Sequence, residues 1–504
     1  MLSVTDPTPL PPPPAAFNMA AYVLGHTDRL ASKLALKIVG DQPEAFTYAQ
    51  IKAAVLGTAT GLQAQGLKPG DHLLMQLGNR PEFPITYLGA IAAGIIPVPV
   101  SSQLTAPELT KISAAINPTL TVQSTEMATA PGPILRADTL RGFWSLPPAE
   151  FAMGDPDRPA YIVFTSGTSG QPRAVVHAHR AIWARRMMWD GWYGLTEDDQ
   201  LMHAGAFNWT YTLGTGLMDP WSVGATALIP SEGTDIADLP GLLAKERATI
   251  FAAAPGVYRR MLRGPLPALP ALRHGLSAGE KLATKLQDRW ETATGTMVHE
   301  AFGMSECSTF ISGAPTRPAP PGSSGYAQPG RKVAMIGSDG PVPRSKPGTI
   351  AIHRSDPGLM LGYHDAATET AARFQGDWFL TGDIGIMGDD GAITYAGRAD
   401  DMMNAGGYRV SPIEVEDALT AHPHINEAAA CAVQLRTDTS VIAAFYVASD
   451  VIDEEALRND MAARLAAYKC PRIYVAKDTL PRGANNKLLR RVLRTEWEAE
   501  HGQT

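Results

Sequence analysis

The stretch YIVFTSGTSGQPR, residues 161–173, places an apolar strand directly before a run of glycine and hydroxyl residues. Glycines let backbone N–H groups converge, hydroxyl groups add donors, and a helical pattern that begins near His179 would add the positive end of its dipole. Such a loop is suited to bind phosphate. A solvated Gly/Ser linker is the alternative interpretation, which fusion to an apolar strand disfavours. The stretch also lacks the Gly-Lys-Ser/Thr ending of a P-loop, which disfavours a kinase- or GTPase-type site.

Short apolar strands alternate with helical patterns on both sides of this loop. Strands are predicted at residues 71–77, 96–100, 161–165, 225–229 and 249–253. This alternation is typical of an α/β protein with helix-covered, mostly parallel sheets. After a Pro/Gly/Ser-rich stretch at 315–329, short strands with turns at 338–340 and 389–391 predict a small antiparallel unit.

The C-terminal part of the sequence predicts a separate small α+β domain. Helices are predicted at residues 411–422 and 454–467, and strands at 428–433 and 441–447. Ser411 is expected to cap the first helix, with Pro412 in its first turn. We therefore predict a disordered Pro-rich tail at residues 1–16, an N-terminal domain at 17–398 and a C-terminal domain at 399–504.

The bulk composition excludes several classes of protein. Of 504 residues, 45% are apolar and 18% charged, and the formal net charge is -7, so no global basic field attracts nucleic acid or anionic lipid. The three cysteines, Cys307, Cys431 and Cys470, are far apart, which argues against disulfides or a zinc cage and fits a cytoplasmic location. The longest apolar run, residues 85–100, is too short for a membrane span. A homo-oligomer is not excluded.

Further segments follow the loop in a fixed order. They are EAFGMSE at 300–306, WFLTGD at 378–383, GRADD at 397–401, GGYRVSPIEVE at 406–416, YKCPR at 468–472, LPR at 480–482 and NKLLR at 486–490. Together with the loop, they resemble the adenylate-forming superfamily, which includes acyl- and aryl-CoA synthetases, luciferases and peptide-synthetase adenylation domains. The resemblance covers nearly the whole chain after Phe17.

The resemblance implies a two-step reaction. A carboxylic acid would react with ATP to give an acyl-adenylate and pyrophosphate, and coenzyme A would then accept the acyl group. The resemblance implies that the loop binds ATP through Thr165, Ser166, Gly167, Ser169, Gly170 and Arg173. Glu306 and Thr168 would hold Mg²⁺, a hard cation that prefers oxygen ligands.

The nucleotide itself would be held by the other segments. Glu300 matches the position that accepts a hydrogen bond from the adenine amino group, and Phe302 could stack on adenine or be a plain core aromatic. Asp383 matches the residue that binds the ribose hydroxyls, and the alternative is that Asp383 is only a turn residue. Arg398 matches a residue that makes a second contact with ribose or phosphate. The remaining adenosine positions are Gly279, Glu280, Gly303 and Ser305.

The resemblance also implies a mobile C-terminal domain. Lys487 would bridge the carboxylate and the α-phosphate during the first step. Rotation about Asp400 would then remove Lys487 and bring Gly406 and Gly407 to line a pantetheine tunnel, with Arg409 facing a phosphate.

The acyl pocket is expected near residues 203–214. His203, Phe207, Trp209 and Met304 would form its walls, although these side chains could equally be core. We expect a short or medium aliphatic acid or a simple aryl acid, as in benzoate- and medium-chain-type ligases. No positive residue is obvious there, which disfavours dicarboxylates.

Three residues depart from the family pattern. Arg173 replaces a usual Lys, Asn486 a frequent Gly and Ser305 a frequent Thr. Arg173 and Asn486 suggest a non-catalytic nucleotide-binding protein as one alternative. Acyl transfer to a separate carrier protein is another.

Overall fold

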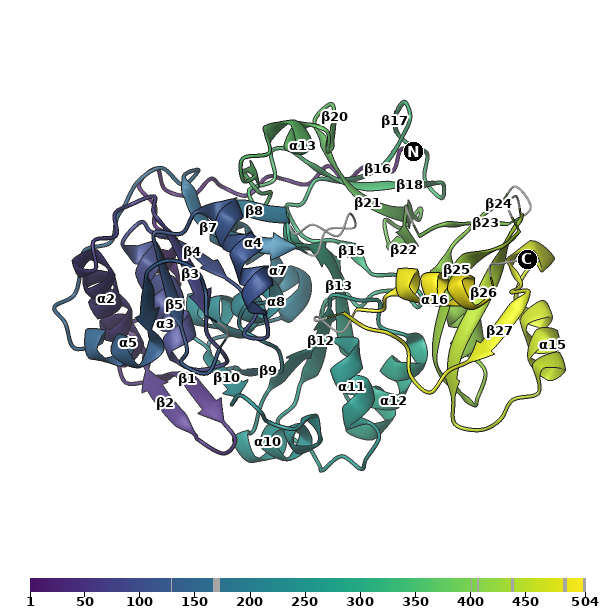
Figure 1. The fold of residues 1–504 in the computed structure, drawn as a ribbon, viewed down its shortest axis with the longest axis horizontal. Coiled ribbons are helices and arrows are strands. Elements are labelled where there is room, and N and C mark those ends of the chain that lie inside the picture. Colours follow the sequence, from purple (N-terminus) through teal and green to yellow (C-terminus); the bar gives the residue numbers. More distant parts are fainter. Residues whose placement is uncertain are drawn as a thin grey trace.

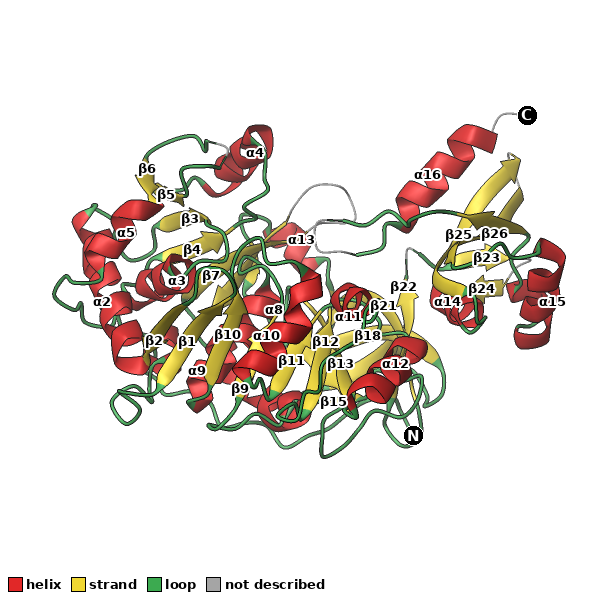
Figure 2. Cartoon of the chain, turned by 90° about the horizontal axis from the view of Figure 1, so that it is seen from below, coloured by secondary structure: helices red, strands yellow, loops and turns green. Residues whose placement is uncertain are grey.

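The computed structural model describes residues 1–127, 129–165, 173–399, 401–405, 408–436, 439–483 and 487–501. It shows a large N-terminal body of layered helices and sheets, with the C-terminal domain at one end of an elongated molecule (Figures 1 and 2). Within the described residues, no helix combines the length and apolar character needed to cross a membrane. The α/β class predicted from the sequence is confirmed.

The first sheet is four-stranded and wholly parallel, in the order β4-β3-β5-β6. Its strands are β3 (His72–Gln76), β4 (Ile96–Pro99), β5 (Leu120–Gln123) and β6 (Ile134–Arg136). The nearby helices are α2 (Tyr48–Ala64), α3 (Glu82–Ala92), α4 (Ala106–Ile116) and α5 (Ala137–Phe143). Every residue of α3 is buried, and α2 packs against α3 and α5. The Thr47 side chain caps α2 through a capping box with Gln50, which fixes where that helix begins.

The second sheet has nine strands in the order β15-β14-β13-β12-β11-β9-β10-β1-β2. Six central strands are parallel: β1 (Leu34–Val39), β9 (Gln200–His203), β10 (Thr226–Pro230), β11 (Ile250–Ala253), β12 (His274–Ala278) and β13 (Val298–Met304). Antiparallel strands β2 (Glu44–Thr47), β14 (Ser308–Ser312) and β15 (Tyr326–Ala327) form its edges. The helices between and around these strands are α1 (Met19–Val23), α8 (Thr210–Leu213), α9 (Asp219–Val223), α10 (Leu239–Glu246), α11 (Pro255–Met261) and α12 (Thr284–Thr294), with a π-helical turn, η2 (Gly214–Met218), after α8. Ligands of open α/β sheets bind at the carboxyl ends of parallel strands, which here lie near Ala278 and Met304.

The glycine- and hydroxyl-rich loop joins two antiparallel strands, β7 (Pro159–Thr165) and β8 (Arg173–Ala178). The strand β8, which was not expected, therefore separates the loop from the helix that was expected near His179. The chain after the loop pairs with β7 and with β19 (Gly362–Tyr363), so its backbone groups are satisfied as strand. The helix that follows, α6 (Ala181–Ala184), is only four residues long and is succeeded by α7 (Arg186–Met188). No helix N-terminus follows the loop directly.

The predicted antiparallel unit is present as a six-stranded sheet. It contains β16 (Val333–Gly337), β17 (Gly340–Pro341), β18 (Pro347–His353), β20 (Phe374–Gln375), β21 (Trp378–Met387) and β22 (Ile393–Arg398), with α13 (Ala367–Ala371) beside it. The chain start pairs with this sheet, because the N–H groups of Ser3 and Thr5 donate to the carbonyls of Val342 and Val333 at 2.8 and 2.9 Å. The expectation of disorder throughout residues 1–16 is therefore wrong for this first segment.

The C-terminal domain is the predicted α+β unit. It comprises β23 (Met403–Ala405), β24 (Tyr408–Val410), α14 (Pro412–Thr420), β25 (Ile425–Arg436), β26 (Thr439–Ala448), α15 (Glu454–Arg464), β27 (Ile473–Ala476) and α16 (Arg490–His501). Helix α15 ends three residues earlier than expected, and a short 3₁₀ turn at Ala467–Lys469 follows. A three-stranded sheet, β25-β26-β27, carries the domain core.

Candidate active site

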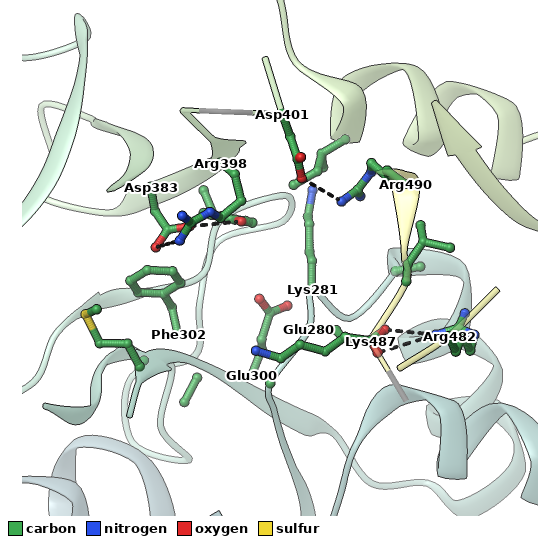
Figure 3. Close-up of a pocket in the computed structure, with 18 of the residues that line it drawn as sticks. Glu280, Lys281, Glu300, Phe302, Asp383, Arg398, Asp401, Arg482, Lys487 and Arg490 are labelled. Atoms are coloured by element: carbon green, nitrogen blue, oxygen red, sulfur yellow. Dashed lines mark hydrogen bonds and ion pairs between the residues drawn. The ribbon is translucent and has the colours of Figure 1, made fainter. Parts of the chain in front are cut away.

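A cavity of about 480 Å³ lies where the N-terminal body meets the C-terminal domain. Its walls come from the ends of β7, β12 and β13, from β21 and β22, and from Arg482, Lys487 and Arg490 of the C-terminal domain (Figure 3). Both acidic and basic side chains line it, and several are paired with one another across the domain boundary.

Glu300 lies on β13 in the wall of this cavity. Its Oε2 accepts a hydrogen bond from the Leu282 N–H at 3.0 Å, and the Ser324 hydroxyl donates to Oε1 at 3.3 Å. Burial raises the pKa of the Glu300 carboxyl to about 7, because desolvation disfavours the charged form. The carboxyl is thus held in one orientation, facing the cavity (Figure 3).

Phe302 and Asp383 lie side by side on neighbouring elements. The Phe302 ring packs against Phe310 and Tyr395, each at a centroid distance of 5.3 Å, while the residue still lines the cavity. The Tyr395 hydroxyl donates to Asp383 Oδ1 at 3.3 Å, and Arg398 Nη1 lies 3.8 Å from Asp383 Oδ2. Asp383 is therefore oriented from two sides.

Gly279 follows β12 with a φ of +96°, a conformation that favours glycine. A Cβ atom there would lie 2.8 Å from Cζ2 of Trp209, so only glycine lets the backbone approach this indole. Trp209 and Gly279 together form one wall of the cavity.

Glu306 is buried at the edge of the cavity, two residues beyond the end of β13. The Tyr363 hydroxyl donates to its Oε1 at 2.8 Å, which orients the carboxylate. Within the described residues, no group of three or more His, Cys, Asp or Glu side chains could hold a metal ion. A single carboxylate that shares a cation with phosphate oxygens fits Mg²⁺, which is often bound in this way.

Arg173 reaches the same cavity from β8. It forms an ion pair with Glu369, and its guanidinium lies 5.3 Å from the centroid of the Tyr363 ring. The planar group is thus positioned by a carboxylate and an aromatic face.

The C-terminal domain contributes Lys487 to the cavity, and Figure 3 shows this side chain pointing into it toward Glu300. The segment around Lys487 is anchored by ion pairs. Arg482 lies 3.2 Å from Glu280 and 2.8 Å from Glu427, and Arg490 Nη2 lies 2.7 Å from Glu416.

Most of the predicted site residues that the structure describes converge here. The cavity is lined by Thr165, Trp209, Arg173, Gly279, Glu280, Glu300, Phe302, Gly303, Met304, Ser305, Glu306, Asp383, Arg398 and Lys487. Ser166, Gly167, Thr168, Ser169, Gly170, Asp400, Gly406, Gly407 and Asn486 lie outside the described residues, and for Arg409 only the backbone in β24 is described.

Two residues that were predicted as walls of the acyl pocket do not line this cavity. Phe207 is buried in the core, with its ring 5.5 Å from that of Phe83. His203 is fully buried under Tyr211, at a centroid distance of 4.4 Å, and burial lowers its pKa to about 3.

Tyr363 and Tyr395 orient two site carboxylates, and the sequence did not indicate either. Tyr395 lies three residues before Arg398, so strict alternation would place the two side chains on opposite faces; a shift in the register between β21 and β22, at Ile384/Gly385, interrupts that alternation. Nothing near Tyr363 pointed to Glu306, because the two residues are 57 positions apart and meet only in the folded chain.

An α/β body and a small α+β domain that meet over one charged cavity are the architecture of a two-domain nucleotide-binding enzyme. The family model described as AMP-binding enzyme matches residues 25–364, and that of the AMP-binding enzyme C-terminal domain matches residues 414–487. The chain therefore belongs to the AMP-binding enzyme family.

Individual relatives match almost end to end. The benzoate–CoA ligase of Thauera aromatica is 30% identical over 529 residues, covering 98% of this chain and 99% of that protein. The mitochondrial acyl-coenzyme A synthetase ACSM5 of Rattus norvegicus is also 30% identical, covering 86% of this chain and 81% of that protein. A solved benzoate CoA ligase from Burkholderia xenovorans LB400 has a TM-score of 0.85 at 28% identity, covering 95% of this chain and 100% of that chain.

Proposed function

We propose that this protein is an ATP-dependent carboxylate–CoA ligase. It converts an acid and ATP into an acyl-adenylate and pyrophosphate, and then transfers the acyl group to the thiol of CoA, releasing AMP. The observation that carries the proposal is the shared cavity, to which the N-terminal body contributes Glu300, Phe302 and Asp383, and the C-terminal domain Lys487. The CoA-ligase relatives favour free CoA over a carrier protein as acceptor.

The nucleotide is held by the described walls of the cavity. Adenine stacks on Phe302, and its amino group donates a hydrogen bond to Glu300. The Asp383 carboxylate accepts hydrogen bonds from the ribose hydroxyls. These contacts place the α-phosphate between the end of β7 and Lys487. The positioning converts a bimolecular attack into a step between fixed partners.

In the first step, a carboxylate oxygen attacks the α-phosphorus and the bond to pyrophosphate breaks. Both reactants are anionic, so the Lys487 ammonium stabilises the charge that develops between them. Glu306, with Thr168, would hold Mg²⁺, which neutralises phosphate charge when bound. Arg173, which also lines this cavity, adds a fixed cation.

In the second step, the CoA thiol attacks the acyl carbonyl carbon and AMP leaves. Rotation about Asp400 withdraws Lys487 and brings Gly406, Gly407 and Arg409 to the site, so that one cavity serves two reactions in turn.

The acid is a short or medium aliphatic acid or a simple aryl acid. Trp209 and Met304 line the side of the cavity next to Ser305, where the acyl group would extend. Relatives that act on benzoate support a compact substrate.

A panel of acids, scored for CoA thioester by mass spectrometry, tests the proposal. We expect at least one small acid to yield acyl-CoA together with AMP and pyrophosphate. Lys487→Ala should lose pyrophosphate release by about 100-fold or more, yet retain thioester formation from a supplied acyl-adenylate. Lys477→Ala, on the same domain, is the matched control and should behave as wild type.

Two results would contradict the proposal. Wild-type protein that binds ATP but releases no pyrophosphate with any acid would favour the non-catalytic alternative. Equal loss of both steps in Lys487→Ala would argue against the alternation of domains.

A further inference from the structure

A second, much smaller cavity of about 20 Å³ lies next to the 480 Å³ cavity of the candidate active site, which we call the nucleotide cavity. The two cavities share Thr210, on α8, and Ser305 as walls. We call the smaller one the distal chamber. Leu213 and Met218 supply its apolar walls, but most of the other side chains that line it are polar. An acyl group that enters from the nucleotide side would reach it end-on, past Ser305.

Two polar atoms of residues that line this chamber are buried without a partner among the described residues. They are the hydroxyl of Tyr87, on α3, and Nδ1 of His177, on β8. Tyr87 is 0% and His177 2% exposed. Buried polar groups are nearly always hydrogen-bonded, so such a pair in one chamber indicates a missing partner.

The chemistry of each atom is fixed by its surroundings. His177 Nε2 lies 2.7 Å from the carbonyl oxygen of Ser305, which can only accept, so Nε2 carries the hydrogen and Nδ1 is an acceptor. Burial lowers the pKa of His177 to about 4, which keeps the ring neutral at physiological pH. The phenol of Tyr87 remains protonated, because burial raises its pKa well above the ordinary value, so it can donate.

The chamber also contains a buried cation that the sequence did not indicate. Arg185 lines it, with Nε 2.8 Å from Oδ1 of the fully buried Asp219. The guanidinium is further bound by the hydroxyls of Tyr193 and Ser308. Since this ion pair is internally neutral, the chamber has no surplus charge to balance a second carboxylate.

We infer that the acid substrate carries a hydroxyl group at the end remote from its carboxylate, and that this hydroxyl binds in the distal chamber between Tyr87 and His177. The inference rests on the proposed ligase function. A hydroxyl donates one hydrogen bond, to His177 Nδ1, and accepts one, from the Tyr87 phenol. The chamber volume suits about one water-sized group, which a hydroxyl is.

An acid without the hydroxyl fits the same walls less well. It either enters the chamber and leaves the polar atoms of Tyr87 and His177 unpaired, or it stops short of the chamber. A site that binds a substrate hydroxyl discriminates strongly against the analogue that lacks it. We therefore expect kcat/KM to favour the hydroxylated acid of a matched pair by at least about tenfold.

Matched pairs of acids test this inference. Benzoic acid is compared with its 3- and 4-hydroxy derivatives, and butanoic acid with its 3- and 4-hydroxy derivatives, by kcat/KM for acyl-CoA formation. Tyr87→Phe removes only the phenol oxygen, so it should reduce the preference for the hydroxylated acid about tenfold. Tyr48→Phe is the control, because its buried hydroxyl donates to the Ala225 carbonyl at 2.6 Å, outside both cavities.

The outcomes separate this inference from the proposed function. Turnover of bare acids with no preference for any hydroxylated partner would overturn the inference and leave the ligase function standing. An undiminished preference in Tyr87→Phe would also overturn it, since the chamber would not be the source. Failure of every acid to form acyl-CoA would overturn both.

Discussion

Glu300 is a carboxyl group whose protonation is coupled to the stability of the folded chain. Burial raises its pKa to about 7, whereas the unfolded chain should release the proton near pH 4.5. Between these values the native state binds more protons than the unfolded state. The stabilisation that is present below pH 4.5 is therefore lost as the pH rises through 7, by up to about 3 kcal/mol, because one pKa unit corresponds to about 1.4 kcal/mol.

Glu300→Gln should remove this dependence. In the absence of nucleotide, the melting temperature of the wild type minus that of the variant should be smaller at pH 8 than at pH 5. Glu150→Gln alters an exposed glutamate and serves as the control. A difference between wild type and Glu300→Gln that stays constant with pH would show that this carboxyl does not titrate as described.

The sequence indicated site residues best where they share one strand. Glu300 and Phe302 stand two positions apart on β13, so a single recognised segment placed both at one cavity. The residues of the distal chamber could not be found in this way. Tyr87, His177 and Arg185 come from separate elements, and none lies in a recognisable motif. Only tertiary packing brings them together.

At the scale of elements, the hydrophobic pattern predicted the strands well, but it did not predict the secondary structure that directly follows the loop. Residues 173–178 form β8, although a helix was expected soon after the loop. Six residues are too few for periodicity to separate strand from helix, and pairing with β7 and β19 decides the outcome. The local sequence contains no information about pairing strands that lie far away in the chain.

The start of the chain behaves as an added edge strand, so weakening its pairing should destabilise the antiparallel sheet. The Thr5 N–H donates to the Val333 carbonyl at 2.9 Å, and its hydroxyl accepts from the Val333 N–H at 2.8 Å. Thr5→Pro removes both contacts, and we expect a loss of roughly 1–3 kcal/mol, seen as a lower melting temperature. Thr8→Pro, at an exposed position of the same segment, is the control. Equal melting temperatures would mean that this pairing adds no stability.

At the scale of the whole molecule, the sequence predicted two domains but not how they meet. The structure brings Lys487 over the cavity through contacts between charged groups of the two domains. Lys285 Nζ lies 3.2 Å from the His422 carbonyl, Arg482 bridges Glu280 and Glu427, and Lys281 Nζ lies 2.6 Å from Asp417 Oδ2. The pairs that cross the boundary, Lys285–His422, Arg482–Glu280 and Lys281–Asp417, each join residues more than a hundred positions apart, so no local pattern could reveal them.

The Lys281–Asp417 pair should favour the arrangement in which Lys487 reaches the nucleotide. Asp417 is about half exposed, so the pair contributes at most about 1 kcal/mol, which is small in stability but sufficient to shift a balance between two arrangements. Asp417→Lys would place two cations opposite one another. We expect pyrophosphate exchange to fall about three- to tenfold, with a smaller effect on thioester formation from a supplied acyl-adenylate.

The charge-swapped protein Lys281→Asp/Asp417→Lys isolates the pair from its surroundings. If attraction across the boundary is the cause, the swap should recover most of the lost exchange rate, and a double-mutant cycle should give a positive coupling. The coupling should shrink in about 0.5 M salt, since screening weakens exposed pairs. Exchange rates that depend on each substitution independently, with no recovery in the swap, would mean that this contact does not hold the domains in the pose required for the first step.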